Sequence, residues 1–393
     1  MAGSRMLLPA LCLAGLAANV SGRTLEPLVT IISLEFSVGI ATGALLISAY
    51  ALPFALGQPV LGPLGDIYGK LRMLKISLWA LTACLFLAAF APTFELLMAS
   101  RFLAGIAAGG VVPACMATIG DSYPPERRQI AISVFVTMGM LAQIFAISAS
   151  GLVGEAFGWR YVLLATAAFG LLGALAASFV LKSRQPQGQQ SFSVGLVTAN
   201  YKSVFKNPKA LLCYSTVFIE GVALYGLMPY VSDMFVQRGI GGASEAGLVI
   251  GSIGIGGLAY VLMLKLLLKR FHVYQFMAAG GILMSLGPLS LAADIAWTAV
   301  AAAFCVTGFG FMLLHNSIQT QVVDLAPASR QSAYSLHAFS FFMGQAAGPV
   351  AFGFGLASVG ARGSLIISAF ILAATGLVVS KLFKRAAKLS AQL

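Results

Sequence analysis

Long apolar runs recur along the whole chain, separated by short breaks that contain charged residues, Pro or Gly. A helix needs about 20 apolar residues to cross the hydrocarbon core of a bilayer. Leu, Ala, Met and Gly dominate the runs, and they do not alternate with polar positions as in a membrane β-barrel. The pattern therefore predicts an all-α integral membrane protein. Its twelve expected transmembrane helices cover residues 6–34, 41–62, 73–92, 94–119, 128–154, 159–182, 209–232, 245–268, 272–293, 295–322, 331–357 and 360–382.

The overall composition supports a protein whose surface faces lipid. Of its 393 residues, 59% are hydrophobic and 9% are charged, and the mean hydropathy is +0.92. Soluble domains carry about 25% charged residues. The N-terminal run could serve as a secretory signal peptide, but its apolar character continues past Leu25 to Leu34, which favours a retained first helix.

The net charge of +12 is distributed as expected for a membrane protein with both termini in the cytoplasm. With this orientation, most Lys and Arg residues fall in cytoplasmic loops or tails. Arg160, Arg238 and Arg362 fall on the outer side of the membrane. We therefore interpret the basic loops as topology signals that contact membrane lipids, and we expect no nucleic-acid partner. The five Cys residues lie within predicted helices, far apart in sequence, which indicates packing rather than disulfide bonds or metal binding.

Three short motifs of the first half recur in the second half in the same order and at nearly the same offset. They are Leu25-Glu-Pro27 with Leu227-Met-Pro229, Asp121-Ser-Tyr-Pro124 and Arg127 with Asp324-Leu-Ala-Pro327 and Arg330, and Gly158-Trp-Arg160 with Gly360-Ala-Arg362. The repeats predict two pseudo-symmetric six-helix bundles with a cavity between them. The expected bundles cover residues 1–182 and 209–383, joined by a cytoplasmic linker over 183–208 and followed by a basic cytoplasmic tail over 384–393.

The break after the second predicted helix contains a recognisable motif, Gly62-Pro-Leu-Gly65-Asp66-Ile-Tyr-Gly69-Lys70-Leu-Arg72. It resembles the loop signature of the major facilitator superfamily, Gly-x-Leu-x-Asp-Arg-x-Gly-Arg-x-Arg, with Ile67 in place of a basic residue. The resemblance implies the twelve-helix fold of that family and a charged latch that closes one bundle against the other. The residues expected in this gating motif are Gly62, Gly65, Asp66, Gly69, Lys70, Arg72, Asp121, Arg127, Asp324 and Arg330.

The fourth predicted helix carries Arg101, followed by the small residues Gly105 and Gly109. This segment resembles a second motif of the family. The glycines form a face for close helix packing. A charge such as Arg101 within a membrane helix is costly and therefore indicates a functional site. The alternative is that the Arg101 side chain reaches the outer membrane interface.

The first predicted helix carries Asn19, Arg23 and Glu26 on one face. Two opposite charges within a membrane helix must face a partner or water. By resemblance to drug and metabolite efflux members of the family, an acidic residue here implies a proton or cation site, which points to Glu26. The alternative is a static Arg23–Glu26 ion pair that fixes helix packing.

Residues in five further helices are candidates for proton or substrate binding. Glu220 is isolated in the middle of its helix and is a second candidate for the proton site. Polar groups among apolar ones suit recognition of an organic solute, although they also hold membrane helices together. These candidates are His315, Asn316 and Gln319 on one helix, His337 and Phe341 with Gln345 on the face of another, and, as weaker candidates, Tyr50, Gln143 and Tyr225.

The resemblance implies a secondary transporter that exports a small organic compound or drug in exchange for protons. The alternative is uptake or facilitated diffusion of a sugar, an organic acid or another small metabolite, including an anionic one. Antiporters of the family carry Gly-Pro where this chain has Ala146-Ile147, whereas Gly348-Pro349 occurs in the second half, and this departure keeps the alternative open.

A membrane-embedded enzyme or a receptor is not expected, because the three His residues lack ligand-spaced neighbours and no added soluble domain is seen. No Gly-x-x-x-x-Gly-Lys-Ser/Thr phosphate-binding loop occurs, so we expect an ion gradient or the gradient of the solute, rather than ATP, to drive transport. We expect no metal and no cofactor. The expected partners are a small-molecule substrate, protons and membrane lipids. We further expect a monomer in a bacterial inner membrane.

Overall fold

The computed structural model describes residues 6–181 and 194–390, and every regular element in these ranges is a helix. The first half contains α2 (Leu7–Arg23), η1 (Glu26–Leu28), α3 (Val29–Glu35), α4 (Ile40–Tyr68), α5 (Lys70–Ala89), α6 (Phe94–Gly109), α7 (Val111–Ser122), α8 (Pro125–Phe157) and α9 (Trp159–Val180). The second half contains α10 (Val194–Phe205), α11 (Ala210–Glu220), the π-helical turn η2 (Gly221–Tyr225), η3 (Met228–Tyr230), α12 (Val231–Arg238), α13 (Ala243–Arg270), α14 (Val273–Ala292), α15 (Trp297–Val323), η4 (Pro327–Ser329) and α16 (Arg330–Ser390).

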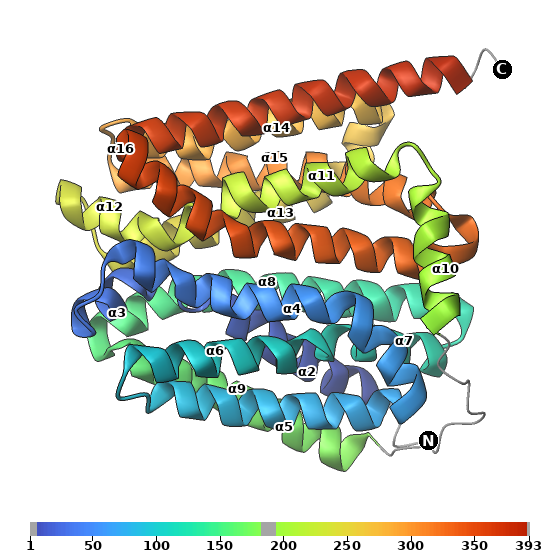
Figure 1. Cartoon of the computed structure of the whole chain (residues 1–393), viewed down its shortest axis with the longest axis horizontal. Helices are drawn as coiled ribbons and strands as arrows, with labels where there is room; N and C mark the ends of the chain where they lie inside the picture. Colours follow the sequence, from blue (N-terminus) through green and yellow to red (C-terminus); the bar gives the residue numbers. More distant parts are fainter. Residues whose placement is uncertain (1–5, 182–193, 391–393) are drawn as a thin grey trace.

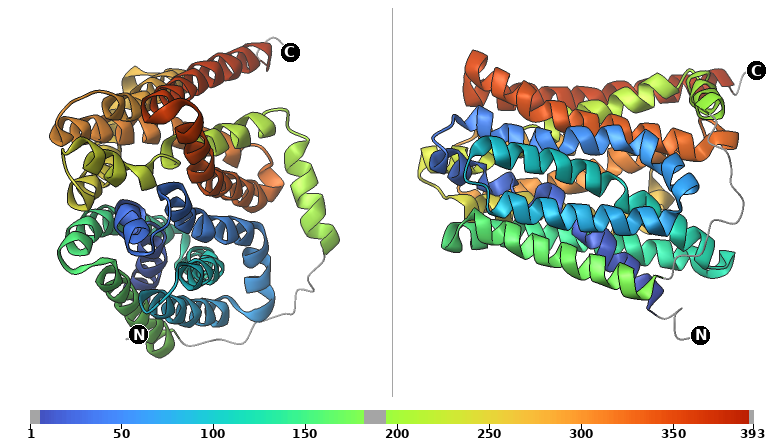
Figure 2. Two further views of the ribbon diagram at one scale, coloured as in Figure 1. Left: turned by 60° about the vertical axis from the view of Figure 1, so that its left-hand side comes forward. Right: turned by 60° about the horizontal axis from the view of Figure 1, so that its bottom comes forward.

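The helices of the two halves form two groups that lie side by side along the long axis of the molecule (Figure 1). Helix α10 runs across one end, beside both groups, as the left view of Figure 2 also shows. We call this the linker end, and the opposite end, which carries α3 and α12, the far end. At the linker end, Tyr201 of α10 donates a hydrogen bond to the Pro59 carbonyl at 3.0 Å, and Ser329 donates one to Asn200 at 3.2 Å. The predicted linker therefore contains a surface helix.

The prediction of twelve membrane-crossing segments is confirmed once two irregular segments are counted. Within the described residues, ten helical segments are long and apolar enough to cross a membrane. One of them, Ser332–Arg385, contains two helices, because α16 changes direction at Gly360. The remaining segment is the first, in which α2 has only 17 residues before the chain breaks at η1.

The first and seventh crossings are both interrupted by a short 3₁₀ turn that contains Pro. Pro27 lies in η1 and Pro229 lies in η3. Proline has no N–H and clashes with the preceding helical turn, so each proline interrupts its helix. The two turns contact each other across the boundary between the halves. The repeated Leu-x-Pro motif is thus a repeated break in the helix.

The repeated Gly-x-Arg motif marks a sharp turn between two helices at the far end. Gly158 separates α8 from α9 with φ of 100°, and Gly360 divides α16 with φ of 74°. A side chain would be strained at these φ values, so both positions require Gly. In the first half, Trp159 donates a hydrogen bond to Glu35 at 2.6 Å, and Arg160 forms an ion pair with the same carboxylate. This turn therefore holds α9 against the end of α3.

Small residues close the far end between the halves. A β-carbon added to Gly151 of α8 would collide with the Ala243 carbonyl of α13, and one added to Gly247 would lie 2.9 Å from the Ile147 carbonyl. Glu155 at the end of α8 accepts a hydrogen bond from the Ser244 N–H at 2.7 Å, at the N-terminus of α13. A carboxylate is stabilised at a helix N-terminus. Helices α8 and α13 therefore seal this end.

The close contact of α8 with α13 predicts that Gly151→Ala destabilises the protein. The added methyl group would overpack the interface, at a cost of about 1–3 kcal/mol. We expect the melting temperature of the purified protein to fall by several degrees in detergent. The matched control is Gly120→Ala in α7, where an added β-carbon meets nothing within 4 Å. Equal melting temperatures for the two variants would contradict this description of the interface.

Candidate functional site

An ion pair lies at the boundary between the halves, next to the break in the first crossing. The Arg23 guanidinium donates to the Glu26 carboxylate at 3.2 Å, and through its other nitrogen to Gln345 of α16 at 3.2 Å. It also lies over the ring of Tyr225, 4.1 Å from the ring centre. Glu26 is buried, and its Oε2 atom has no hydrogen-bond partner among the described residues. Arg23 thus connects a buried carboxylate of the first half with two side chains of the second half.

Arg101 of α6 lies next to the end of α2 and is completely buried. Helix α2 ends at Arg23, so its last carbonyl groups lack partners within the helix. The Arg101 guanidinium donates to the carbonyl oxygens of Ser21 at 2.8 Å and Gly22 at 3.3 Å, and it lies over the Tyr50 ring. It therefore does not extend to the membrane interface. The Tyr50 hydroxyl in turn lies 2.8 Å from the Ser21 hydroxyl.

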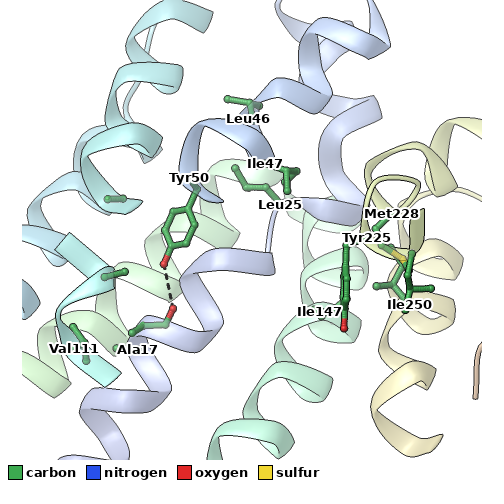
Figure 3. Close-up of a cluster of buried hydrophobic side chains, with 14 of the residues drawn as sticks. Ala17, Leu25, Leu46, Ile47, Tyr50, Val111, Ile147, Tyr225, Met228 and Ile250 are labelled. Atoms are coloured by element: carbon green, nitrogen blue, oxygen red, sulfur yellow. Dashed lines mark hydrogen bonds between the residues drawn. The ribbon is translucent and has the colours of Figure 1, made fainter. Parts of the chain in front are cut away.

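A cavity of about 100 Å³ adjoins the ion pair and lies between α2, α8, α13, α15 and η2. Arg23 and Gln143 are its polar side chains, together with Tyr225, whereas most of the remaining wall is aliphatic or glycine. Figure 3 shows Tyr225 beside Ile147 and Ile250, two of the apolar residues of this wall. The arrangement suits a small, largely apolar solute with few polar groups.

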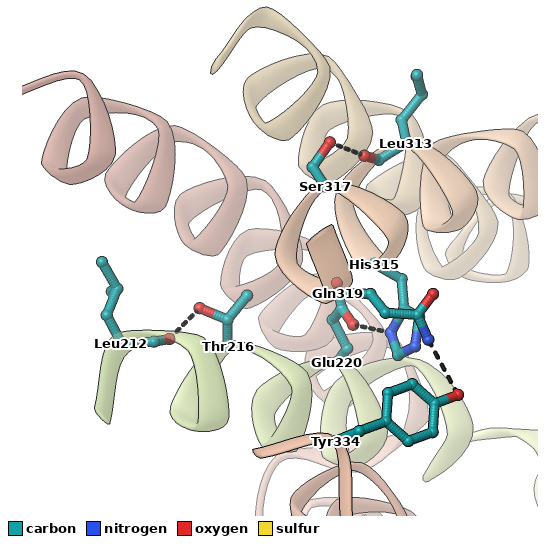
Figure 4. A network of polar contacts seen from close by, with 8 residues as sticks. All are labelled: Leu212, Thr216, Glu220, Leu313, His315, Ser317, Gln319 and Tyr334. Atoms are coloured by element: carbon teal, nitrogen blue, oxygen red, sulfur yellow. Dashed lines mark hydrogen bonds and ion pairs between the residues drawn. The ribbon is translucent and has the colours of Figure 1, made fainter. Parts of the chain in front are cut away.

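A second buried carboxylate lies in the second half. Glu220 ends α11, immediately before the π-helical turn, and its Oε2 atom lies 2.8 Å from Nδ1 of His315 (Figure 4). Its Oε1 atom has no partner among the described residues, and the same holds for Nε2 of buried His337. The rings of His315 and His337 lie in contact, with centres 4.9 Å apart.

Aromatic rings connect the two carboxylate sites. Tyr225, which stacks with Arg23, contacts Phe311 and Phe341 at centre distances of 5.7 and 5.5 Å. His315 contacts the same two phenylalanines at 4.8 and 4.7 Å. The structure therefore brings together predicted residues from the first, seventh, tenth and eleventh crossings.

The other predicted polar residues lie at the margins of this site. Gln319 donates to the Tyr334 hydroxyl at 3.3 Å, and Asn316 interacts with Tyr260 of α13. Asn19 faces α8 at Gly139, where an added β-carbon would lie 2.9 Å from the Asn19 amide nitrogen. These contacts connect neighbouring helices.

The predicted gating residues at the linker end form one ion pair among the described side chains. Lys70 lies 2.8 Å from Asp121, and both belong to the first half. Gly69 separates α4 from α5, while Arg72, Arg127, Asp324 and Arg330 have exposed side chains. Gly62, Gly65 and Asp66 lie in the last turns of α4, and their contacts fall outside what the structure describes.

Sequence reasoning missed several contributors to the site. Phe311 lies one helical turn before His315 and could have been found from that spacing. Ser21 and Tyr334 gave no signal in the sequence, because their roles arise from contacts with distant segments. The aliphatic cavity wall also gave none, since apolar residues are the norm in every membrane helix.

The fold and the buried charged site define a membrane transporter, and comparison with known proteins gives its family. A family model described as Major Facilitator Superfamily matches residues 11–331. The chain belongs to this superfamily and is therefore an integral membrane secondary transporter rather than an enzyme.

Relatives agree with this family, and two solved structures share the fold. The uncharacterized MFS-type transporter YwfA of Bacillus subtilis is 26% identical over 361 residues, covering 90% of this chain and 88% of that protein. The multidrug export protein EmrB of Haemophilus influenzae is 25% identical over 165 residues, covering 42% of this chain and 32% of that protein. The nucleoside transporter NupG superposes with a TM-score of 0.77 at 16% identity, covering 97% of this chain and 99% of NupG. A bacterial homolog of the lysosomal transporter Spinster, inward-facing and unoccupied, superposes with a TM-score of 0.72 at 17% identity, covering 98% of each chain.

The role of Arg101 as a donor to α2 predicts that Arg101→Met is strongly destabilising. The change leaves the Ser21 and Gly22 carbonyl groups without donors in a buried environment, at a cost of roughly 2–5 kcal/mol. Arg101→Lys should lie in between, because lysine lacks the planar fork that reaches two acceptors. Thermal unfolding monitored by size-exclusion chromatography tests this order. The exposed control Arg127→Met should match the wild type, and an equal loss in Arg127→Met and Arg101→Met would contradict the assignment.

Proposed function

We propose that this transporter exports a small organic compound in exchange for protons. The observation that carries the proposal is the Arg23–Glu26 pair, which lies between the halves and contacts both of them. A buried carboxylate, one oxygen of which has no partner in the part of the chain that the structure describes, is suited to take up a proton. Because Arg23 also contacts Gln345 and Tyr225, a change in the charge of Glu26 would alter contacts with the second half.

Proton uptake at Glu26 would couple to movement through Arg23. While Glu26 is ionised, its charge holds the Arg23 guanidinium against Gln345 and Tyr225. Protonation removes the ionic attraction and leaves Arg23 free to move away from the cavity wall. A solute that enters the cavity and contacts the Arg23 guanidinium in this position would hold it beside Glu26, and would therefore favour the ionised form of Glu26 and release of its proton. Solute and proton would then exclude each other, as exchange requires.

The lining of the cavity supports an organic solute with apolar or aromatic surface. Aliphatic side chains and Phe311 form most of the wall, and glycines bring helix backbones close to it. Most contacts available to a solute are therefore non-directional, which suits compounds of varied shape. The partial similarity to a multidrug export protein supports the same direction of transport.

A second candidate is uptake or facilitated diffusion of a small anionic metabolite. The observation that favours it is the charge of the cavity, since Arg23 is the one charged side chain among the described residues that line it. A carboxylate or phosphate group could pair with the planar guanidinium through two hydrogen bonds. In that case the solute would replace Glu26 as the partner of Arg23.

For either candidate we propose alternating access by a monomer in a bacterial inner membrane. Residues 1–182 would rock against residues 209–383, with the linker end and both termini in the cytoplasm. The sealed far end then corresponds to an inward-facing state. Residues 183–208 would connect the moving halves, with α10 resting on both of them.

The proposed coupling predicts that Glu26→Gln abolishes proton movement driven by the solute. Glutamine keeps the size of the side chain but cannot release a proton. The measurement is proton flux in proteoliposomes containing a pH-sensitive dye, with drugs, sugars and organic acids as test solutes. Glu220→Gln should retain flux if Glu26 alone carries the proton. The matched control is Glu95→Gln, whose carboxylate is exposed.

Each outcome of this experiment has a defined meaning. Loss of flux in Glu26→Gln but not in Glu95→Gln supports exchange through Glu26. Loss in Glu220→Gln alone would move the proton site to the second half. Solute movement without proton movement in every version would exclude proton exchange and favour the facilitator.

Alternating access predicts that a disulfide between α8 and α13 stops transport. A β-carbon at Gly251 would lie 3.5 Å from Cβ of Ser148, which is within the range of disulfide-bonded cysteines. Gly251 also lines the cavity, so the reference is the single variant Gly251→Cys. We expect the double variant Ser148→Cys, Gly251→Cys to lose transport when oxidised and to regain the level of this single variant after reduction, because the cross-linked far end cannot open. Solute flux with and without dithiothreitol checks this. Full transport by the oxidised, cross-linked protein would refute rocking of the two halves.

A further inference from the structure

A groove on the membrane-facing side of the first half is separate from the central cavity. It has a volume of about 500 Å³ and is formed by Leu61 of α4, by one face of α5 and by Leu103, Ile106 and Ala107 of α6. The α5 face comprises Arg72, Met73, Ile76, Ser77, Ala80 and Cys84. The volume falls within the range of about 300–1,000 Å³ that is typical of small-molecule sites.

The groove is open toward the lipid. Ile76, Leu103 and Ile106 expose 60%, 48% and 46% of their surfaces, so no described part of the chain covers them. From Arg72 to Cys84, the groove follows α5 for about 18 Å at the rise of an α-helix. The hydrocarbon core of a bilayer is roughly 30 Å thick, so one leaflet accounts for about half of that thickness. The length of the groove is close to the depth of one leaflet. An apolar groove of this length fits the acyl chain of a lipid.

One end of the groove carries a positive charge. Arg72 lies in the first turn of α5, at the linker end, and its side chain is exposed. It has no hydrogen-bond or ion-pair partner among the described residues, whereas neighbouring Lys70 binds Asp121 and Lys75 donates to the Ser178 carbonyl. No acidic side chain belongs to the described lining. The guanidinium is therefore available to an anion at the depth of the lipid headgroups.

We propose that this groove is a binding site for one anionic phospholipid of the leaflet at the linker end. One of its two acyl chains lies along α5 between Leu61 and Ile106, and its phosphate group pairs with Arg72. Arginine suits this role because its planar fork binds phosphate through two hydrogen bonds. The site is independent of the transported solute, so it stands whichever transport mode applies.

The test is native mass spectrometry of the full-length protein released from nanodiscs of equimolar dioleoylphosphatidylglycerol and dioleoylphosphatidylcholine. These lipids share their acyl chains, so only the headgroup distinguishes them. The wild type should retain phosphatidylglycerol preferentially. Arg72→Gln should lower this preference about fivefold, the effect of one basic residue at an anionic surface. Ala80→Phe, which fills the groove, should reduce retention of both lipids.

A control variant separates the groove from general surface charge. Arg270→Gln removes an exposed arginine at the same end of the molecule, outside the groove, and should retain the wild-type preference. Equal retention of the two lipids by the wild type would overturn the proposal without any variant. An equal loss of the preference for phosphatidylglycerol in Arg270→Gln and Arg72→Gln would also overturn it. The same holds if free glycerol phosphate displaces bound phosphatidylglycerol as strongly as the intact lipid does.

Discussion

Helix α2 ends at Arg23 within the membrane-embedded part of the chain, where its last carbonyl groups need donors that lipid cannot supply. Arg101 provides them, which explains why a guanidinium is completely buried next to Tyr50. Because the helix is interrupted at this point, Glu26 lies at the start of the 3₁₀ turn η1. The Arg23 side chain reaches Gln345 of the second half. The arrangement of polar side chains at the centre of the transporter thus depends on how the last carbonyl groups of one interrupted helix obtain hydrogen-bond donors.

Both buried carboxylates lie where regular helix structure is interrupted. Glu26 begins the 3₁₀ turn η1, and Glu220 precedes the π-helical turn η2. Among the described residues, each has one oxygen without a hydrogen-bond partner, although its other oxygen contacts Arg23 or His315. Such half-satisfied groups are costly in a protein interior. The Glu26–Arg23 pair lies at the boundary between the halves, and aromatic rings connect it with Glu220 in the second half, so both carboxylates are candidates for groups whose contacts change under the proposed alternating access.

Much of the fold could be predicted from the sequence, because each membrane crossing requires a long apolar segment that the local hydropathy shows. The repeated motifs at Pro27 and Gly158 also marked equivalent breaks and turns. The site was less predictable, since periodicity shows which residues share a helix face but not which helix they meet. The contact of Arg23 with Gln345 and the capping of α2 by Arg101 join residues far apart in sequence. The helical part of the linker was also missed, because its composition suggested only a polar connection.

The contact between the turns η1 and η3 has a mechanical consequence. It lies nearer the far end, because α2 extends 17 residues toward the linker end, whereas α3 extends only 7 residues in the opposite direction. At the rise of an α-helix, these arms measure about 25 Å and about 10 Å. If the halves rotate about this contact, as proposed above, the rotation would act as a lever with unequal arms. The entrance at the linker end would widen more than twice as far as the entrance at the far end, so the protein should admit bulky molecules more readily from one side.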